Sequence, residues 1–519
     1  MTDSPSSVQT SVGTRGRRAL WLLVGFALLI VANGRWIFPL ASWFFAVGWL
    51  VYVDRSRRLS GLTTAFVAYV LANFVFWWGI IPAPGVLYYL IAATYAAVYF
   101  LPFVAHRLLA GEAAGFKGTL VFPLAWVSAE FVFSRWLTPY GSWASLAYTQ
   151  SEQLALVQLA SLTGVTGISF LMTWFASVVA WMLRPDLDAR RRVRAAGTFA
   201  VVFLAVLIFG QLRLATDRVG DPVRTAALVP SAAAVDELER LLAPVRRGEP
   251  LADSVLPAIE AAAARLNDDL LLRTQREARA GARLIAWSET AGRLFVFDEE
   301  AFLARAGRLA AEEGVTLMLA LGVWHPDDAP PFENKVVAID PTGSVVWEYR
   351  KAHPIVGAEA SFVDAGGGAV LALDEEFGRV GAVICHDLDF PPLLRQASAQ
   401  RIGLIVAPSA DWSVIAVLHA RMAVFRAVEN GFTLLRPTSN GRSIAVDTRG
   451  RVLARLDFPE DAMIADVSAV PVRTLYGMAG DWFSWLCIAA LVLLSFVLRR
   501  GTGVRYAGSR STSALPSES

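Results

Sequence analysis

Eight apolar runs, each close to the length that a helix needs to cross a bilayer, constrain this chain more than any other feature. The hydrocarbon core of a membrane takes roughly 20 apolar residues as a helix. The mean hydropathy of +0.47 agrees, because an ordinary soluble enzyme is less apolar. The runs cover residues 19–33, 36–53, 62–82, 84–104, 118–136, 164–183, 197–213 and 482–498. We therefore expect a membrane α-helical bundle of about eight transmembrane helices.

The positive charges of the short loops predict the orientation of this bundle. Cytoplasmic loops carry an excess of Lys and Arg. With the N-terminus in the cytoplasm, the opposite short loops hold only Arg35 and Arg135, and residues 214–481 lie outside. The expected parts are a disordered cytoplasmic start (1–14), a membrane domain (15–215), an outer domain (216–476), a last span (477–500) and a disordered cytoplasmic tail (501–519).

The outer segment has the pattern of a layered α/β domain. Predicted strands cover 222–230, 282–289, 315–324, 334–340, 344–351, 378–385 and 401–410, and predicted helices cover 252–280, 299–313, 391–400 and 414–430. Continuous apolar strands indicate a sheet that is buried on both faces. Two or three packed layers are the usual solution for such elements.

Three ionisable residues stand at the ends of predicted strands: Glu289, Lys351 and Cys385. Strand ends of an α/β sheet are where sites form. Glu289 can take the thiol proton as a general base, and Cys385 can then attack a carbonyl and hold the acyl group as a thioester. Lys351 can stabilise the oxyanion, helped by the backbone N–H of His386. The pattern predicts cysteine-based amide or acyl-transfer chemistry.

Each of these residues also has an ordinary alternative. Cys385 can be a small buried hydrophobe, Glu289 a loop carboxylate and Lys351 a surface charge. Lys335, which follows Asn334 in a predicted strand, is the rival for the role of the cation.

Several classes of site are not expected. Cys487 lies in an apolar run and Cys385 in a polar region, so the two are not expected to form a disulfide. Two Cys and five scattered His do not make a zinc pattern. The net charge of +2 provides no basic field for nucleic acid. We expect no metal and no cofactor.

The sequence blocks around the three residues resemble the nitrilase superfamily, and within it the apolipoprotein N-acyltransferase family. The blocks are AWSETAG, EYRKAHPIVGAE, VICHDLDFPPLLRQA and FRAVENGFTLLRPTSNGRS, in that order. The membrane part also resembles this family, in TPYGSWASLAYTQ, VQLASLTGVTGISFL and RTLYGMAGDWF. About four-fifths of the chain is covered.

The resemblance implies an αββα domain on eight helices, with a Glu289–Lys351–Cys385 triad and a second glutamate, Glu359. It implies transfer of an acyl chain from a phospholipid, through a Cys thioester, to the N-terminal amine of a diacylglyceryl-cysteine lipoprotein. The expected location is a bacterial inner membrane, with the catalytic domain on the periplasmic side. A monomer is expected.

The chain departs from the family pattern beside the cysteine. The family usually carries Tyr then Glu there, whereas this chain has His386 and Asp387. The family loop SNDAWFG is PSADWSV here, with Trp412 as an expected supporting residue. These changes affect the expected pocket walls, and so the donor and acceptor, more than the reaction type.

Other hypotheses stay open at this point. Water in place of the amine would make the protein a membrane-anchored amidase, and another amine acceptor would make it a related acyltransferase. A silent scaffold or transporter is the third class. Glu130 lies inside a predicted span, and we expect it to reach water or pair with Arg135 rather than line an acyl path. Arg426 and Glu429 are expected to form a structural pair.

Overall fold

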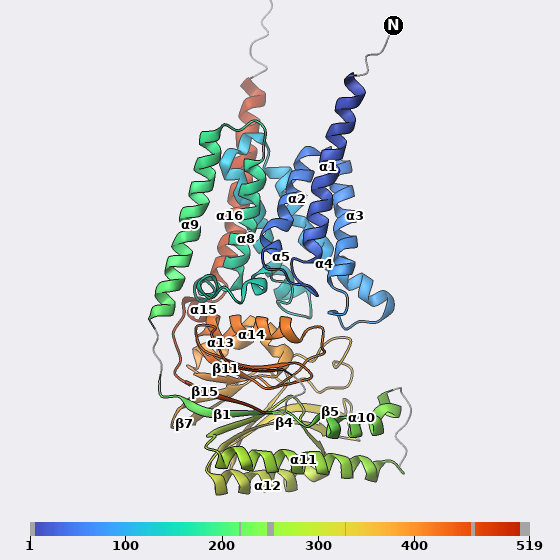
Figure 1. The fold of residues 1–519 in the computed structure, drawn as a ribbon, viewed down its shortest axis with the longest axis vertical. Helices are drawn as coiled ribbons and strands as arrows, with labels where there is room; N and C mark the ends of the chain where they lie inside the picture. Colours follow the sequence, from blue (N-terminus) through green and yellow to red (C-terminus); the bar gives the residue numbers. More distant parts are fainter. Residues whose placement is uncertain (1–5, 217–219, 247–253, 327, 458–461, 509–519) are drawn as a thin grey trace, which may run out of the picture.

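The computed structural model describes residues 6–216, 220–246, 254–326, 328–457 and 462–508. Figure 1 shows two parts stacked along the long axis, a bundle of helices and an α/β domain beneath it. The chain enters the domain after α9 (Ala189–Ala215) and returns to the bundle through α15 (Leu475–Ala479) and α16 (Trp482–Gly508). The α/β domain is thus inserted between the last two long helices.

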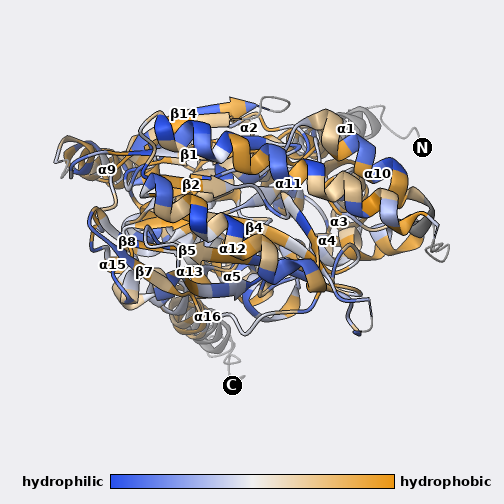
Figure 2. Cartoon of the chain, turned by 90° about the horizontal axis from the view of Figure 1, so that it is seen from below, coloured by the Kyte–Doolittle hydropathy of each residue, from blue (hydrophilic) through white to orange (hydrophobic). Residues whose placement is uncertain are grey.

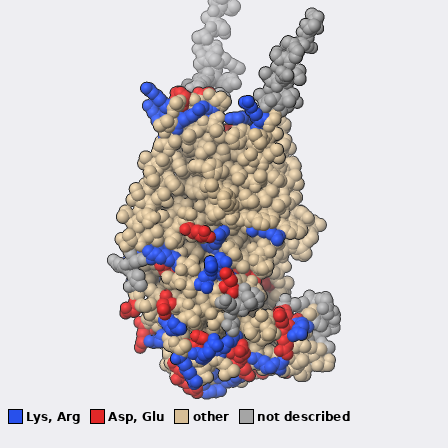
Figure 3. Space-filling view, viewed as in Figure 1, with Lys and Arg blue, Asp and Glu red and all other residues tan. Residues whose placement is uncertain are grey.

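Among the described residues, five helical segments are long and apolar enough to cross a membrane. They are α3 (Arg58–Phe76), α4 (Gly85–Leu109), the segment Gly115–Leu137, α8 (Val165–Met182) and α9. Figure 3 shows a broad band over the bundle with almost no charged side chains, bordered by charges at its far end and over the α/β domain. Such a band is the surface that a bilayer requires.

The expected count of eight spans is only partly supported. Helices α1 (Ser6–Ile30), α2 (Ala41–Arg55) and α16 coincide with the other three predicted runs, but they fall outside the five long apolar segments. The expected disordered ends overlap α1 and α16, which begin at Ser6 and end at Gly508, while residues 1–5 and 509–519 lie outside the described part.

The α/β domain contains two facing sheets. The first has the order β15-β1-β2-β4-β5-β6 with β3 on β4, and the second has the order β14-β13-β11-β9-β8-β7. The first contains β1 (Val223–Leu228), β2 (Leu284–Trp287), β3 (Gly292–Phe295), β4 (Thr316–Trp324), β5 (Phe332–Ile339), β6 (Val345–Arg350) and β15 (Ala462–Val467). The second contains β7 (Ala372–Glu375), β8 (Gly378–Ala382), β9 (Leu404–Val406), β11 (Thr433–Arg436), β13 (Arg442–Val446) and β14 (Val452–Asp457). A short pair, β10 (Ser409–Ala410) and β12 (Thr438–Ser439), lies beside them.

Helices cover the outer face of each sheet. Figure 1 shows α11 (Leu256–Arg279) and α12 (Val296–Glu313) on the side away from the bundle, and α13 (Pro391–Ala399) and α14 (Ala416–Asn430) on the side that faces it. Hydrophilic and hydrophobic residues alternate along α11 and α12 (Figure 2), as is typical of helices with one face on a sheet and the other in water. The inner faces of the sheets share one core, which includes Ala286, Met318 and Val336 against Val380, Ile405 and Leu434. The predicted αββα sandwich is confirmed.

Glu130 does not behave as expected. Its side chain is buried in the bundle and accepts hydrogen bonds from Ser145 Oγ at 2.6 Å, Ser169 Oγ at 3.2 Å and Trp126 Nε1 at 3.2 Å. The expected escape to water or pairing with Arg135 is therefore wrong. Ser145 and Ser169 from neighbouring segments, and Trp126 from the same helix, satisfy the carboxyl group inside the bundle instead.

The α/β domain docks onto the loops of the bundle through buried polar contacts. The predicted Arg426–Glu429 pair on α14 is confirmed at 2.9 Å. Arg426 Nη2 also donates to Tyr148 Oη at 2.7 Å, and Glu429 Oε1 accepts from the Val165 backbone N–H at 2.9 Å. These two hydrogen bonds connect the buried ion pair of α14 to the bundle loops, and separating the two parts would leave their polar groups without these partners.

A second contact joins the loop 138–145 to the segment after Cys385. The backbone N–H of Ser142 donates to Asp389 O at 2.9 Å. Gly141 adopts φ +59°, and a Cβ there would lie 2.2 Å from the same oxygen. The close approach of the two backbones therefore requires a glycine.

We expect Gly141→Ala to destabilise the protein more than Gly115→Ala. Both glycines have φ near +60°, but a Cβ at Gly115 meets no described atom within 4 Å. Backbone strain alone should cost about 1 kcal/mol, and the clash with Asp389 should add about 1–3 kcal/mol. Denaturant unfolding in detergent measures both. Equal losses in the two variants would show that the junction is loose.

Candidate active site

Lys351 is the centre of the candidate site. It follows β6, is fully buried, and its Nζ lies 2.8 Å from Glu289 Oε1 and 2.6 Å from Glu359 Oε2. Burial alone lowers the pKa of an amine, but the two carboxylates outweigh it and raise the pKa of Lys351 well above its usual value. The residue is therefore a permanent ammonium at the end of its strand.

Glu289 and Glu359 are themselves held in place. Asn334 Nδ2 donates to Glu289 Oε1 at 2.8 Å, and the backbone N–H of Ile355 donates to Glu359 Oε2 at 3.0 Å. Asn334 lies on β5, and the sequence analysis did not single it out. All three side chains line a groove of about 920 Å³ that runs beside α10 (Ala232–Arg246). We call this groove the outer groove.

Cys385 lies at the end of the segment that follows β8. Its φ is +46°, which is uncommon for a residue with a side chain, and its backbone N–H donates to Pro408 O at 2.8 Å. Burial raises the pKa of the Cys385 thiol well above its usual value, the charge of Glu289 raises it further, and Lys351 acts in the opposite direction. The thiol is therefore protonated at rest and needs a base, and both charged groups lie within electrostatic reach of it.

Lys335 is not the cation of this site. It neighbours Asn334 on β5, so its side chain points to the opposite face of the strand. There its Nζ pairs with Glu299 at 2.6 Å, Glu333 at 3.0 Å and Glu348 at 3.1 Å.

Asp387 connects the segment that carries Cys385, which we call the cysteine segment, to the segment that carries Lys351. The fully buried carboxylate accepts hydrogen bonds from Tyr349 Oη at 2.8 Å and from the backbone N–H groups of His353 at 2.9 Å and Ile384 at 3.0 Å. Burial alone would raise its pKa, but His353 and the other donors lower it below its usual value. Asp387 thus fixes the spacing between Lys351 and Cys385.

His386 and Trp412 face the membrane bundle. His386 Nδ1 lies 3.0 Å from His353 O, and Trp412 Nε1 donates to Gly79 O at 2.9 Å in the α3–α4 loop. Both line a small cavity of about 30 Å³, which we call the junction pocket. Its walls are Trp77, Ile80, Ile81, Pro82, Tyr95, Tyr140, Trp143, Ile355, His386 and Trp412.

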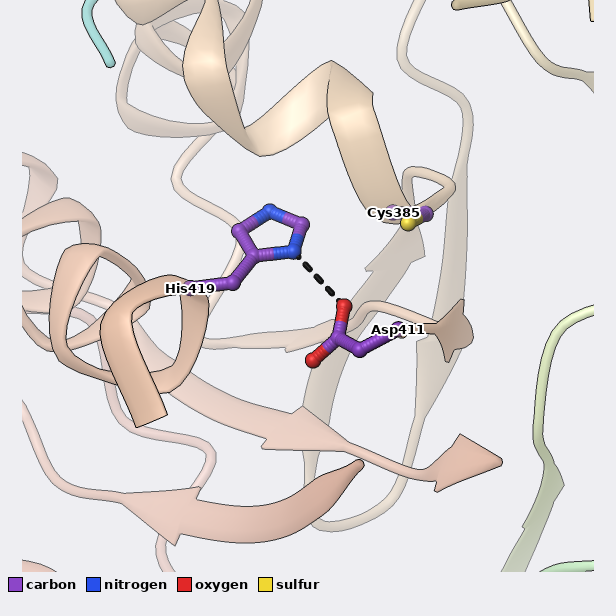
Figure 4. Close-up of side chains that lie close together, drawn as sticks. All are labelled: Cys385, Asp411 and His419. Atoms are coloured by element: carbon purple, nitrogen blue, oxygen red, sulfur yellow. Dashed lines mark hydrogen bonds and ion pairs between the residues drawn. The ribbon is translucent and has the colours of Figure 1, made fainter. Parts of the chain in front are cut away.

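A buried ionic network lies behind the thiol. Figure 4 shows Cys385, Asp411 and His419 side by side, with their polar atoms within 4.8 Å of one another. His419 Nδ1 is 2.8 Å from Asp411 Oδ1, its Nε2 is 3.4 Å from Asp389 Oδ2, and Arg436 Nη2 is 2.9 Å from Asp411 Oδ1. A thiol, an imidazole and a carboxylate could bind zinc. Here, however, the Arg436 guanidinium lies 2.8 Å from His419 Nδ1, and its charge disfavours a metal ion.

Sequence analysis did not identify this network. Asp411 lies five residues before the start of α14 and His419 lies in its first turn, so their closeness in the sequence was a usable signal. Arg436 lies at the end of β11, and nothing in its local sequence indicates its partners.

Comparison with known proteins agrees with this architecture. The family model of carbon-nitrogen hydrolase matches residues 249–475, and that of the apolipoprotein N-acyltransferase N-terminal domain matches residues 18–178. The apolipoprotein N-acyltransferase of Geobacter metallireducens is 28% identical over 481 residues, which cover 85% of this chain and 87% of the relative. That of Pseudomonas syringae pv. tomato is 27% identical over 448 residues, which cover 80% and 81%. Among solved structures, an amidase from Nesterenkonia sp. is 20% identical, with a TM-score of 0.38, over 48% of this chain and 92% of that chain.

We expect His419 to make stability depend on pH. Burial opposes its charge, but Asp389 and Asp411 outweigh this and raise its pKa from 6.5 to about 9. The protonated form stabilises the fold fully below about pH 6.5, and this contribution is lost as the pH rises through about 9. The free energy of unfolding should therefore fall by about 3 kcal/mol across this window.

Denaturant unfolding in detergent at several pH values measures this change. His419→Gln should be less stable than wild type at low pH and should lack the slope. A flat wild-type profile would mean that His419 is neutral and accepts a hydrogen bond from Arg436.

Proposed function

We propose the reaction of this chain in residue terms, from its similarity to apolipoprotein N-acyltransferases over most of its length. It moves a fatty acyl chain from a phospholipid, through a thioester on Cys385, to the N-terminal amine of a diacylglyceryl-cysteine lipoprotein. The observation that carries the proposal is the Glu289–Lys351–Glu359 cluster, from which the charges of Glu289 and Lys351 act on the buried Cys385 thiol. The two substrates are lipids, and the site lies in the domain that docks onto the membrane bundle.

In the first half-reaction the thiol becomes the nucleophile. Glu289 takes the proton of Cys385, and the thiolate attacks the ester carbonyl of the phospholipid. The Lys351 ammonium and the backbone N–H of His386 stabilise the oxyanion. The carbon–oxygen bond then breaks, Glu289 returns its proton to the leaving lysophospholipid oxygen, and the acyl group stays on Cys385.

In the second half-reaction the amine replaces the lysophospholipid. The uncharged amine attacks the thioester carbonyl, and Glu289 takes one of its protons. The carbon–sulfur bond breaks, the thiolate regains that proton, and an amide remains on the lipoprotein. Lys351 stays charged throughout, because Glu289 and Glu359 favour its ammonium form.

The proposed setting is a bacterial inner membrane, with the enzyme acting as a monomer. The loop charges support a catalytic domain on the periplasmic side. Helices α13 and α14 lie between the second sheet and the bundle (Figure 1), so the cysteine segment is close to the membrane helices. Three further residues support the site. Glu359 holds Lys351, Asp387 holds the cysteine segment, and Trp412 holds the α3–α4 loop.

Incubation with a phospholipid labelled in its acyl chain tests the proposal. After an acid quench, mass spectrometry should find the acyl group on Cys385 as a hydroxylamine-sensitive thioester. A diacylated lipopeptide should then discharge it as an amide. Cys385→Ser should form no thioester, whereas the matched variant Cys487→Ser, in the last helix, should behave as wild type. Release of free fatty acid alone would instead identify an amidase-type hydrolase.

Lysine substitution tests the assignment of the cation. Lys351→Met should lower kcat by about 100- to 1,000-fold, the usual cost of removing an oxyanion donor. Lys335→Met removes the other buried lysine of this domain and should leave kcat near the wild-type value. Thermal melts check that both variants fold. An equal loss in the two variants would contradict the assigned role of Lys351.

A further inference from the structure

The resting Cys385 thiol donates its hydrogen to a backbone carbonyl. Its Sγ makes a weak hydrogen bond of 4.0 Å to Ala410 O. Only the protonated thiol can donate in this way, so the contact favours the uncharged form. Ala410 belongs to β10, and the backbone N–H of the next residue, Asp411, donates to Ser439 O on β12 at 3.0 Å. The position of the acceptor oxygen therefore depends on how Asp411 is held.

The Asp411 side chain places a negative charge behind the same sulfur. Its carboxylate lies within 4.8 Å of Cys385 Sγ, and both side chains are buried. Arg436 Nη2 donates to its two oxygens at 2.9 and 3.1 Å, and His419 Nδ1 lies 2.8 Å from Oδ1. Burial alone would raise the pKa of Asp411, but Arg436 and His419 lower it to about 2. An ionised carboxylate this close to the sulfur disfavours a thiolate.

Charged groups reach the thiol from three directions. They are Glu289, Lys351 and Glu359 of the catalytic cluster, His386, Asp387 and Asp389 of the cysteine segment, and Asp411, His419 and Arg436 behind it. Burial, Glu289 and Lys351 have the largest effects on the pKa of Cys385; after them, Asp411 raises it and Arg436 lowers it. The group behind the thiol thus contains opposing charges that act on the nucleophile without a role in the two half-reactions.

We propose that Asp411 is a positioning residue that keeps the Cys385 thiol protonated and unreactive until an acyl donor occupies the site, and that the positive charges of His419 and Arg436 limit this effect. The inference rests on the proposed function and adds a control of its nucleophile. A permanently ionised thiol reacts with oxidants and stray electrophiles. A thiol that loses its proton to Glu289 only beside a bound carbonyl is spared those reactions.

The experiment measures how fast the free thiol reacts with iodoacetamide. The full chain carries Cys487→Ser, so Cys385 is its only thiol. Purification in detergent without phospholipid, followed by hydroxylamine, leaves this thiol unacylated, and EDTA keeps metal ions off it. The thiolate attacks the reagent, a carbon–sulfur bond forms and iodide leaves. Mass spectrometry gives the rate across neutral and alkaline pH.

Four variants separate charge from packing. Asp411→Asn removes the negative charge, and Asp411→Glu keeps it. His419→Gln removes one of the positive charges that oppose it. Asp374→Asn makes the same chemical change at an exposed residue paired with Arg379 and is the matched control.

Asp411→Asn should react about tenfold faster than the wild type at neutral pH, with its pH profile moved by about one unit toward acid. Asp411→Glu should return the rate toward the wild-type value, and Asp374→Asn should not change it. His419→Gln should react more slowly than the wild type, because a cation beside Asp411 is gone. Faster reaction of both Asp411→Asn and His419→Gln would mean that loosened packing controls the thiol, and this would overturn the inference, as would no change in either.

The wild-type protein provides a test that does not depend on the folding of a variant. Its thiol should react slowly at neutral pH and much faster at alkaline pH. Equal rates at both would show a thiol that is already ionised at rest, and the proposed role of Asp411 would be wrong. Thermal melts check the fold of each variant.

Thioester formation from a labelled phospholipid separates this inference from the proposed function. In Asp411→Asn its pH profile should move in the same direction as that of the reaction with iodoacetamide. The expected iodoacetamide pattern without any thioester would remove the proposed reaction and keep the role of Asp411. A thioester on Cys385, together with iodoacetamide rates that respond to neither Asp411 nor His419, would remove that role and keep the reaction.

Discussion

A fully buried ammonium is the constraint on which the rest of this structure depends. An isolated charge cannot leave water without a large penalty, so Lys351 can exist at the end of β6 only where carboxylates meet it. Glu289 must arrive from β2 and Glu359 from the loop after β6, at 2.8 and 2.6 Å. Asp387 then ties the cysteine segment to the same place through Tyr349, His353 and Ile384. The arrangement of the first sheet and the placement of Cys385 therefore both follow from the need to keep the Lys351 side chain protonated.

Hydrophobic pattern and strand-end position were enough to predict most elements and the residues Glu289, Lys351 and Cys385. The misses have physical causes. Strands β3 and β7 have only four residues each, and neither is a continuous apolar run, so the local pattern is weak there. Asn334 could not be distinguished in the sequence from any other polar residue on a strand. Its role is to donate a hydrogen bond to Glu289, which comes close to it only in the folded domain. The expectation for Glu130 failed because it considered only water and Arg135 as partners of the carboxyl group. Ser145 and Ser169 come close to Glu130 only in the folded bundle, and Trp126 lies one turn earlier on the same helix.

The bundle contributes to the chemistry as well as to anchoring. Loop 138–145 places Trp143 on Asp389 and Tyr140 beside His386, with ring centroids 6.4 Å apart. Trp412 reaches back to Gly79 in the α3–α4 loop. The cysteine segment is therefore shaped from both sides, by its own sheet and by the bundle loops. The two residues that differ from the family pattern, His386 and Asp387, therefore each act together with neighbouring residues. Asp387 belongs to the interior of the α/β domain, whereas His386 belongs to the boundary with the bundle.

The docking of α14 limits how the enzyme can move during turnover. Arg426 and Glu429 are anchored to Tyr148 and Val165, which belong to separate parts of the membrane half, so tilting the two halves apart would break both hydrogen bonds and expose a buried ion pair. Opening must then come from loop segments and single side chains, which relax within nanoseconds to microseconds rather than in slow domain swings. With a fixed frame, each lipid has to reach Cys385 through such local rearrangements at the boundary between the two halves, and the halves keep their relative position while it does so.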